Sequence, residues 1–493
     1  MNNLIVLPMV IPVFTGIILV FLRPYIKMQR WLSVLSMMLT GGLSVYLLQQ
    51  IQAHGILSLA FGDWPAPYGI VFVADPFAML LVLTTSFVTL VCLLYAFSTI
   101  GEAYEKMFFY PFILFLTAGV NGSFLTGDLF NLFVCFEVML IASYILVMLG
   151  GRKVRLQESI KYIAINVLSS WIFLVGIAYL YGAMGTVNMA DLADKVSQAG
   201  QSPILTTISI LFLIVFALKS GLLLFFWLPG SYSVPPAAVA ALFAALLTKV
   251  GVYAMFRTFS LIFFHEPSIT HTLIGVMAAV SIMIGSIGAV AYQDIRQIAA
   301  FNIVIAIGFM MIGLAVSTPA ALEGSIYYLI HDIIVKAMLY LIIGTMIMLT
   351  GKTRIKQMSG LIRNYPILGW LFFIVTLSLA GIPPFSGFIG KILIGQGTVE
   401  SGAYLLLALA FLSSIFVLYS LLRIFMNCFW GETIMTIEDE KPLKKSFLLP
   451  SLMLAVATLV LGLGAETLAA YVTDASAILM NPDVYIDAVL PED

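Results

Sequence analysis

Apolar runs of about twenty residues recur along the whole chain and are separated by short polar or charged segments. A run of about 18 or more apolar residues has the length of a membrane-spanning helix. We therefore predict an all-α polytopic membrane protein with fourteen transmembrane helices. The predicted helices cover residues 3–22, 31–51, 73–97, 107–126, 128–149, 160–182, 203–228, 236–257, 271–292, 297–317, 322–349, 366–397, 402–426 and 446–470.

The distribution of Lys and Arg supports this helix count. With the N-terminus outside, seventeen of these residues fall in inside segments and only Lys195 and Arg257 fall outside, while four lysines lie within predicted helices. Fourteen crossings then place both termini outside, and the acidic tail after residue 466 agrees with that side. The inside residues are Arg23, Lys27, Arg30, Lys106, Arg152, Lys153, Arg155, Lys161, Arg296, Lys352, Arg354, Lys356, Arg363, Arg423, Lys441, Lys444 and Lys445.

Two predicted helices must be interrupted. Helix 203–228 contains Ser-Gly directly after Lys219, and helix 366–397 is too long for one straight crossing and contains the sequence GIPP before Lys391. Proline removes a backbone donor and clashes with the preceding turn. Broken helices at membrane depth line cavities and mark transport sites. The two interrupted helices are five apart, as expected for a repeat of five helices whose second copy is inverted.

No soluble domain interrupts the helices. The longest inside loop, residues 431–446, is charged and short. The segment 53–69 has Gly, Pro and Trp at positions typical of a membrane interface. We expect this segment at the outer membrane surface, where it can form a two-stranded hairpin.

The composition agrees with this fold class and excludes other functions. Of the 493 residues, 62% are apolar and 10% are charged, against about 25% charged in soluble domains. The mean hydropathy is +1.09, and the net charge of −1 gives no indication of nucleic-acid binding. The N-terminus has no positive residue before its apolar run, which indicates a retained helix and not a signal peptide. Cys92, Cys135 and Cys428 are expected to be buried, without disulfides, metals or cofactors.

Four lysines and one glutamate lie deep within predicted helices. A lysine at the bilayer centre costs about 2.5–3.5 kcal/mol, so four of them cost on the order of 10 kcal/mol. A purely structural scaffold has no reason to carry them, whereas a protein that moves ions or protons does. These residues are Lys219, Lys249, Lys336, Lys391 and Glu137.

Each of these residues also has a structural interpretation. Glu137 can pair with a lysine for packing alone, and Lys219 and Lys391 can extend their ammonium groups to the membrane surface. We favour a functional role for Glu137, because intramembrane carboxylates usually line ion pathways, and an outer proton exit at Lys391. Lys249 has no acidic residue within one turn, so its partner must come from another helix or from water. Asp128 is predicted to be a helix N-cap.

Asp332 and Lys336 are four residues apart, so they share a helix face and can form an ion pair, structural or functional. His331 points elsewhere and is either a proton carrier or a packed polar group. A buried lysine that gains and loses a carboxylate partner can release and recapture a proton. Sodium is a hard cation, and hard cations prefer several oxygen ligands. The predicted helices contain two buried acids and four lysines, a balance that favours a proton relay over a sodium-binding site.

The chain resembles the antiporter-like subunits of respiratory complex I and of Mrp-type multisubunit sodium/proton antiporters. The resemblance covers about residues 70–430, and within the family the length and the opening MNNLIVLPMVIPVFTGIILVF are most similar to Mrp D subunits, since A subunits are much longer. The segments that carry it are NGSFLTGDLFNLFVCFEVMLIASYILV, FALKSGLLLFFWLPGSYSVPPAAVAALFAALLTKVGVYAMFR, HDIIVKAMLY and LSLAGIPPFSGFIGKIL.

The resemblance implies inverted repeats formed by helices four to eight and nine to thirteen, hence regions 1–106, 107–257, 271–426 and 446–493. It implies a bacterial inner-membrane location and partner subunits A, B, C, E, F and G. It also implies a first half-channel in which Glu137 pairs with Lys219, a central hydrated axis, and a second broken helix. The relay residues that follow from it are Glu137, Lys219, Lys249, His331, Asp332, Lys336 and Lys391.

We therefore predict a proton-translocating subunit of a multisubunit Na+/H+ antiporter, which is a transporter and not an enzyme and does not work as an antiporter alone. The alternative within the family is a proton-pumping subunit of complex I or of a membrane-bound hydrogenase. A structural scaffold is disfavoured by the buried lysines, and a metabolite transporter by the lack of a substrate-sized polar cluster.

Overall fold

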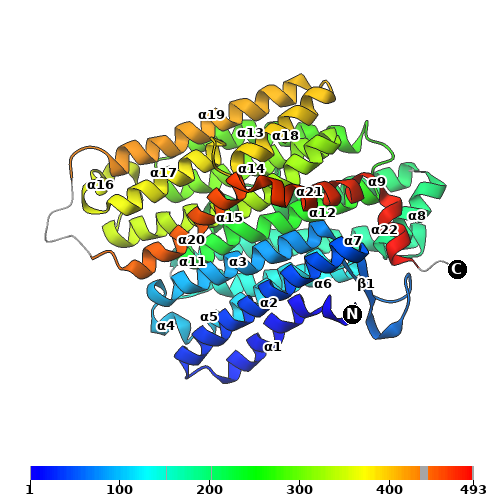
Figure 1. Cartoon of the computed structure of the whole chain (residues 1–493), viewed down its shortest axis with the longest axis horizontal. Helices are drawn as coiled ribbons and strands as arrows, with labels where there is room; N and C mark the ends of the chain where they lie inside the picture. Colours follow the sequence, from blue (N-terminus) through cyan, green and yellow to red (C-terminus); the bar gives the residue numbers. More distant parts are fainter. Residues whose placement is uncertain (1, 152, 201, 434–441, 491–493) are drawn as a thin grey trace.

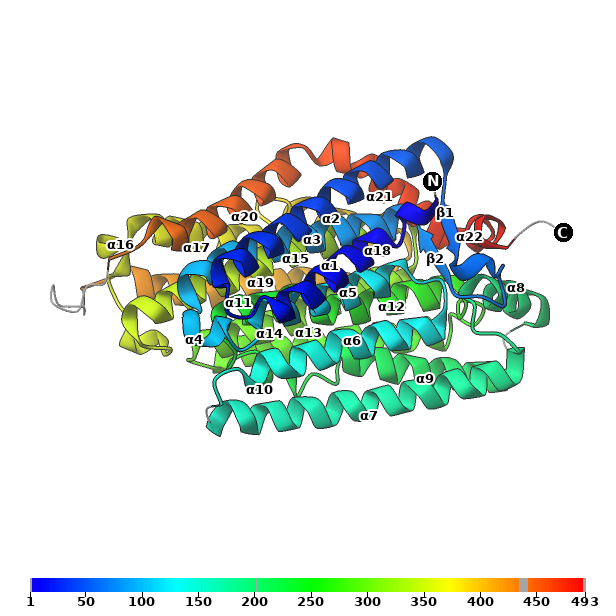
Figure 2. The same cartoon turned by 90° about the horizontal axis from the view of Figure 1, so that it is seen from below.

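The computed structural model describes residues 2–151, 153–200, 202–433 and 442–490. The described chain is a bundle of long, roughly parallel helices (Figure 1). Helix α15 (Pro319–Thr350) lies in the middle of the bundle in both views (Figures 1 and 2). Of the predicted inside residues, Arg152 and Lys441 lie outside the described residues, as does the middle of the loop 431–446.

Within the described residues, eleven helical segments are long and apolar enough to cross a membrane, and three shorter apolar helices join them. This confirms a helical polytopic membrane protein. The elements that contain these segments are α1 (Leu7–Phe21), α2 (Ile26–His54), α3 (Pro76–Thr99), α5 (Phe109–Leu125), α6 (Leu129–Met148), α7 (Lys153–Met184), α9 (Pro203–Ser220), α11 (Ala237–Leu242) with α12 (Thr248–Leu261), α13 (Thr270–Ala291), α14 (Ile295–Val316), α15, α17 (Pro366–Ala380), α19 (Tyr404–Ile424) and α20 (Lys445–Leu463).

Short elements connect the long helices. A two-stranded hairpin follows α2, with β1 (Leu57–Ala60) antiparallel to β2 (Val71–Ala74) and Leu57 opposite Ala74. Only its first strand lies within the segment 53–69, and its second strand reaches into the predicted helix 73–97. The other short elements are η1 (Asn2–Leu4), η2 (Phe61–Asp63), α4 (Glu102–Glu105), α8 (Met189–Ala199), α10 (Leu228–Ser231), η3 (Phe243–Leu247), η4 (Ile355–Gln357), α16 (Leu361–Asn364), α18 (Gly387–Glu400), η5 (Phe425–Phe429), α21 (Ala465–Met480) and α22 (Pro482–Val489).

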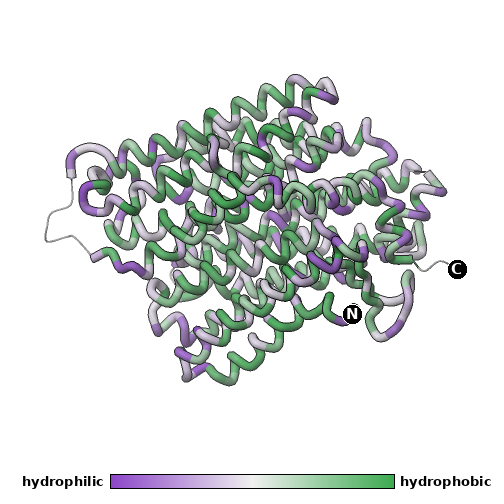
Figure 3. Tube along the Cα trace, viewed as in Figure 1, coloured by the Kyte–Doolittle hydropathy of each residue, from purple (hydrophilic) through white to green (hydrophobic). Residues whose placement is uncertain are grey.

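The two ends of the bundle differ in what they carry. Both chain termini, the hairpin, α8 and α22 lie at one end, whereas α4 and α16 lie at the other (Figures 1 and 2). Hydrophobic positions run along the helices, and hydrophilic positions gather mainly towards the two ends (Figure 3). Lys106 follows α4 and Arg363 lies in α16, while Lys195 lies in α8 at the end with the termini. This separation matches the predicted distribution of basic residues between two sides.

Both predicted helix interruptions are present. Helix α9 ends at Ser220, and Gly221 follows with φ +80°. Helix α17 ends at Ala380, Gly381 has φ +83°, and α18 starts only at Gly387. A left-handed residue after the last turn is the usual helix C-terminus, and glycine adopts it without a Cβ penalty.

Local side-chain hydrogen bonds explain several helix starts. The Asp128 carboxylate accepts the Asn131 N–H at 2.7 Å and thereby caps α6, as predicted. Asp75 does the same for α3 through the Ala78 N–H at 2.8 Å. Such caps satisfy backbone donors that a helix start leaves unpaired.

Arg257, predicted at the outer end of a helix, is buried inside the protein. Arg257 lies in α12, is only 3% exposed, and forms an ion pair with the fully buried Asp75. Its guanidinium also donates a hydrogen bond to the Tyr253 hydroxyl and lies 5.1 Å from the ring centre of Tyr485 in α22. Arginine pairs well in buried sites because the N–H groups of its planar guanidinium match the two oxygens of a carboxylate. The sequence does not reveal which carboxylate will be the partner.

The C-terminal region also differs from the expectation of one helix followed by a tail. Helix α20 ends at Leu463, and α21 and α22 follow it as separate helices. Val472, Ala475 and Leu479 on one face of α21 are buried, because α21 packs against α15 and α3. Burial of this apolar face holds α21 against the helix bundle.

We predict that Arg257→Ala strongly destabilises the protein, because it leaves the Asp75 carboxylate buried and without its charged partner. Breaking a buried ion pair by removing one side costs about 3–5 kcal/mol. The thermal unfolding midpoint in detergent should therefore fall well below that of the wild type.

Lys161→Ala is the matched control, since the 64% exposed Lys161 side chain pairs with Glu158 at 2.7 Å on the surface. An exposed pair contributes only about 0–1 kcal/mol. Equal midpoints for the two variants would contradict a stabilising role of the buried pair.

Candidate functional site

The centre of the bundle holds one carboxylate between two ammonium groups. Asp332 of α15 lies 2.8 Å from the Lys249 Nζ of α12 and 3.7 Å from the Lys336 Nζ one turn along its own helix. Asp332 and Lys249 are fully buried, and Lys336 is 1% exposed. The predicted Asp332–Lys336 pair is therefore present, and the partner of Lys249 comes from another helix, as expected.

Backbone carbonyls complete the surroundings of both ammonium groups. The Lys249 Nζ donates to the Ala244 carbonyl at 2.7 Å, and the Lys336 Nζ donates to the Asn302 carbonyl of α14 at 2.9 Å. Ala244 lies in η3, a π-helical turn between α11 and α12. Such turns change the hydrogen-bonding pattern of a helix and are frequent at functional sites. The π turn and the Asn302 carbonyl were not predicted.

The charge balance of this cluster determines what it can do. Two ammonium groups and one carboxylate carry a net charge of +1 when all are ionised, and a buried charge without a partner is unfavourable. Loss of one proton from either lysine leaves a neutral lysine and one ion pair. The cluster can therefore exist with one proton more or less, which is the property a proton relay requires.

A second group of polar residues lies at the end of α9. The Lys219 Nζ donates to the Ser170 hydroxyl of α7 at 3.0 Å, and Ser170 in turn donates to the Glu137 carboxylate of α6. Ser170 thus joins the two residues for which a direct pair was expected. The Lys219 Nζ also lies 5.0 Å from the Phe136 ring centre, a cation–π contact.

The exposure of these two charges differs from the expectation that both are buried. Lys219 is 5% exposed and does not extend to the membrane surface. Glu137 is only half-buried, because Val134, Val138 and Ile141 on the same side of α6 are exposed in this chain. Glu137 therefore borders the outer wall of the bundle and not its interior.

Helix α12 fits closely against the end of α9. A Cβ atom on Gly251 would lie 2.6 Å from the Ser220 nitrogen, so only glycine permits this approach. Gly251 is two residues after Lys249, and Ser220 directly follows Lys219. The two polar groups are thereby held on neighbouring helices.

The ammonium group of Lys391 caps the other interrupted helix. Its Nζ donates to the Leu379 and Ala380 carbonyls at the end of α17, both at 2.9 Å, and to the Ser414 hydroxyl of α19 at 2.8 Å. These carbonyls have no helical partner because α17 stops there. Lys391 is 9% exposed. Its ammonium group is therefore held at the helix break and does not extend to the membrane surface.

His331 faces away from Lys336, as predicted, and contacts the second helix break. Its Nδ1 lies 2.7 Å from the Ser386 hydroxyl, which directly precedes α18. Its ring is 5.2 Å from that of Tyr328. A Cβ atom on Gly387 would lie 2.9 Å from the His331 Nε2 and 2.2 Å from the Ser378 carbonyl. Glycine at 387 is what lets the break approach α15.

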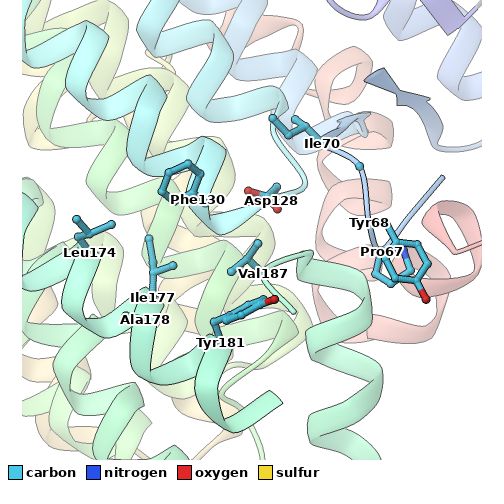
Figure 4. A pocket seen from close by; sticks show the side chains of 11 residues that line it. Pro67, Tyr68, Ile70, Asp128, Phe130, Leu174, Ile177, Ala178, Tyr181 and Val187 are labelled. Atoms are coloured by element: carbon cyan, nitrogen blue, oxygen red, sulfur yellow. The ribbon is translucent and has the colours of Figure 1, made fainter. Parts of the chain in front are cut away.

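A hollow of about 420 Å³ lies at the end of the bundle that carries the termini, apart from the four lysines. Its wall is formed by loop residues such as Pro67 and Tyr68 and by residues of α6 and α7, with the Asp128 carboxylate among apolar side chains (Figure 4). This wall offers one charged group and little polar surface for a metabolite. In the described part of the chain, no cluster of three His, Cys, Asp or Glu side chains is placed to hold a metal.

Comparison with known proteins places the chain among transport proteins. Residues 126–417 match the family described as NADH:quinone oxidoreductase/Mrp antiporter, transmembrane. The chain is 48% identical, over the full length of both sequences, to the D subunit of the Na(+)/H(+) antiporter of Bacillus subtilis (strain 168).

Two solved structures share the fold over nearly the whole chain. A chain of the Mrp complex from Dietzia sp. DQ12-45-1b has a TM-score of 0.93 and 32% identity, with 99% of each chain covered. A chain of respiratory complex I from Thermus thermophilus has a TM-score of 0.83 and 26% identity, with 97% of this chain and 100% of that chain covered.

We predict that Gly387→Ala destabilises the protein, because its Cβ would meet both the His331 ring and the Ser378 carbonyl. Forcing an extra carbon into a packed site costs about 1–3 kcal/mol. The thermal unfolding midpoint should fall. Gly42→Ala in α2 is the control, since a Cβ there meets no atom within 4 Å, and its midpoint should stay or rise. A Gly387→Ala midpoint at or above the wild-type value would contradict the close approach.

Proposed function

We infer the function of this chain from its family: it belongs to the NADH:quinone oxidoreductase/Mrp antiporter family, and we propose that it is the proton-translocating D-type subunit of a multisubunit Na+/H+ antiporter. The supporting observation is the central cluster of Lys249, Asp332 and Lys336, in which two buried ammonium groups share one buried carboxylate. A membrane protein with only a structural role has no need of such a cluster.

The proposed relay runs across the bundle through groups that the described contacts bring together. Protons pass from Glu137 through Ser170 to Lys219, and from there to the neighbouring cluster around Lys249. Lys336 and His331, on the same helix as Asp332, receive the proton next. Lys391 at the second helix break is the last residue of the relay. Direct contacts join Glu137, Ser170 and Lys219, and likewise Lys249, Asp332 and Lys336. The steps between these groups require water molecules.

The proposed transfer is electrostatic. A proton that arrives at Lys249 makes this ammonium compete with Lys336 for Asp332, since both lie within 4 Å of the same carboxylate. At 4 Å, two unit charges interact with about 4 kcal/mol at an effective dielectric constant near 20. A change of one charge is therefore sufficient to favour release of a proton from the neighbour.

We propose fourteen transmembrane spans with two inverted repeats, helices four to eight and nine to thirteen, in a bacterial inner membrane. The interrupted α9 and the interrupted pair α17–α18 would be equivalent members, each ending beside a lysine. The regions 1–106, 107–257, 271–426 and 446–493 follow from this layout. Both termini would lie outside, because α4 and α16 carry their neighbouring basic residues at the opposite end (Figure 1).

The proposed partners are the other Mrp-type subunits, A, B, C, E, F and G, and sodium would cross the membrane elsewhere in that complex. The bundle interior supports this division, since the buried acids Asp332 and Asp75 are each already paired with cations. The chain would therefore be a transporter subunit without catalytic chemistry of its own.

The second candidate is a proton-pumping subunit of a redox complex, favoured by the fold shared with a chain of respiratory complex I. The proposed antiporter role is supported by the higher identity to an antiporter subunit, 48% against 26%. Copurified subunits decide between the two: small membrane subunits would support the antiporter, and iron–sulfur or quinone-reducing subunits the redox complex.

We predict that Glu137→Ala, Lys219→Ala or Lys249→Ala abolishes sodium-dependent proton movement, because each removes a group that holds or stabilises the proton. The rate should fall roughly a hundredfold, as for loss of a positioned proton-transfer group. The measurement is the sodium-induced change in a pH gradient across everted vesicles that carry the whole complex. Lys161→Ala, on an exposed ion pair, is the control. Wild-type rates in all three variants with an assembled complex would refute the relay.

A second prediction concerns the chain alone. Purified and reconstituted in liposomes, it should not exchange sodium for protons, because Asp332 and Asp75 are engaged by cations and no group of three His, Cys, Asp or Glu side chains in the described residues is placed to hold a cation. The readout is ²²Na uptake driven by a pH gradient. Uptake comparable to that of the whole complex would show that the chain suffices.

A further inference from the structure

A row of buried hydroxyl groups starts at His331 and leaves the central helix. The His331 Nδ1 lies 2.7 Å from the Ser386 hydroxyl, which lies 2.6 Å from the Thr458 hydroxyl of α20. Thr458 in turn lies 2.7 Å from the Ser378 hydroxyl in the last turn of α17. All four side chains are fully buried. Four helices or helix breaks are thus joined by three short hydrogen bonds.

Most buried hydroxyls of this chain are used differently. Thr376, also fully buried in α17, donates to the Phe372 carbonyl one turn earlier in its own helix, at 2.9 Å. Ser260 and Thr258 of α12 do the same. This is the common arrangement of Ser and Thr in apolar helices. Ser386, Thr458 and Ser378 instead bond one another across helices.

Helix α20 is held tightly in the break between α17 and α18. The Ser386 N–H donates to the Thr458 carbonyl at 3.1 Å. A Cβ atom on Gly462, one turn further along α20, would lie 2.0 Å from the Pro384 carbonyl. The position of the Thr458 hydroxyl is therefore fixed by backbone contacts on both sides and not by chance packing.

The row ends beside the site of Lys391. Ser378 directly precedes Leu379 and Ala380, whose carbonyls hold the Lys391 Nζ. The Tyr328 ring lies near both residues, with its centre 5.2 Å from the His331 ring centre and 5.9 Å from the Lys391 Nζ. In the described residues, no hydrogen bond joins His331 directly to Lys391.

We propose that Ser386, Thr458 and Ser378 form a hydroxyl relay that carries protons between His331 and the helix break at Lys391. This inference rests on the proposed function and names the route of one of its steps. It makes α20, which lies outside both proposed repeats, a working part of the pathway.

Each transfer in this relay conserves protons. A hydroxyl can donate one hydrogen bond and accept others at the same time. When Ser386 receives a proton from Nδ1, it passes its own proton to Thr458, and Thr458 passes its proton to Ser378. Ser378 releases one proton at the break, where the Lys391 amine, in its neutral form, accepts it through water. Rotation of the three hydroxyls then restores the starting orientation.

The test uses three variants of the whole complex in everted vesicles. Thr458→Val keeps the side-chain shape but removes the hydroxyl, and it should lower sodium-dependent proton movement by roughly tenfold or more, since a positioned proton-transfer group contributes about a hundredfold. Thr458→Ser keeps the hydroxyl and should restore most of the rate. Thr376→Val, a buried threonine bonded only within its own helix, should be unchanged.

The outcomes separate this inference from the proposed function. A wild-type rate in Thr458→Val beside an inactive Lys249→Ala refutes the hydroxyl relay alone. Wild-type rates in Glu137→Ala, Lys219→Ala and Lys249→Ala together refute the proposed function. If Thr458→Val does not assemble, Ser386→Ala decides instead: loss of rate supports the relay, and a wild-type rate overturns it. Failure of Thr458→Ser to restore the rate would assign Thr458 to packing and also overturn the relay.

Discussion

The carboxylate of Asp332, shared by two ammonium groups, is the interaction on which the rest of this structure depends. A buried cation is tolerated only with a partner of opposite charge and satisfied hydrogen bonds. Asp332 supplies that partner to Lys249 and Lys336 together. This requires α11, η3 and the first turn of α12 to lie against α15, and α15 itself to run through the centre of the bundle (Figure 2). The surrounding helices are arranged around this contact and shield it from lipid.

Backbone carbonyls accept further hydrogen bonds from three of the buried lysines. The end of α17 offers two free carbonyls to Lys391, the π turn before α12 offers the Ala244 carbonyl to Lys249, and α14 offers the Asn302 carbonyl to Lys336. Non-helical backbone at membrane depth is tolerated only inside protein or beside water. The Lys391 ammonium group is held by two such carbonyls and the Ser414 hydroxyl, whereas Lys249 and Lys336 also share the Asp332 carboxylate.

The features that could be predicted from sequence are those that depend on local order. Apolar runs located the helices, Gly-Pro sequences located the breaks, and a spacing of four placed Asp332 beside Lys336. The features that could not be predicted depend on contacts between distant helices. Ser170 and Thr376 both lie in apolar segments, yet only Ser170 joins two charged residues, and this follows from which helices pack together. For the same reason the buried ion pair of Arg257 could not be predicted, because its partner Asp75 lies 182 residues earlier.

That separation between Asp75 and Arg257 has a consequence for how the chain enters the membrane. Synthesis proceeds at about 5–20 residues per second, so the carboxylate is made roughly 10–40 s before its guanidinium partner. During this interval Asp75, which caps the start of α3, lacks the guanidinium that offsets the cost of burying its carboxyl group. Burial of this end of α3 therefore becomes favourable only once α12 has emerged. The order in which charged residues are synthesised is therefore a constraint on the folding of this protein, in addition to their final positions.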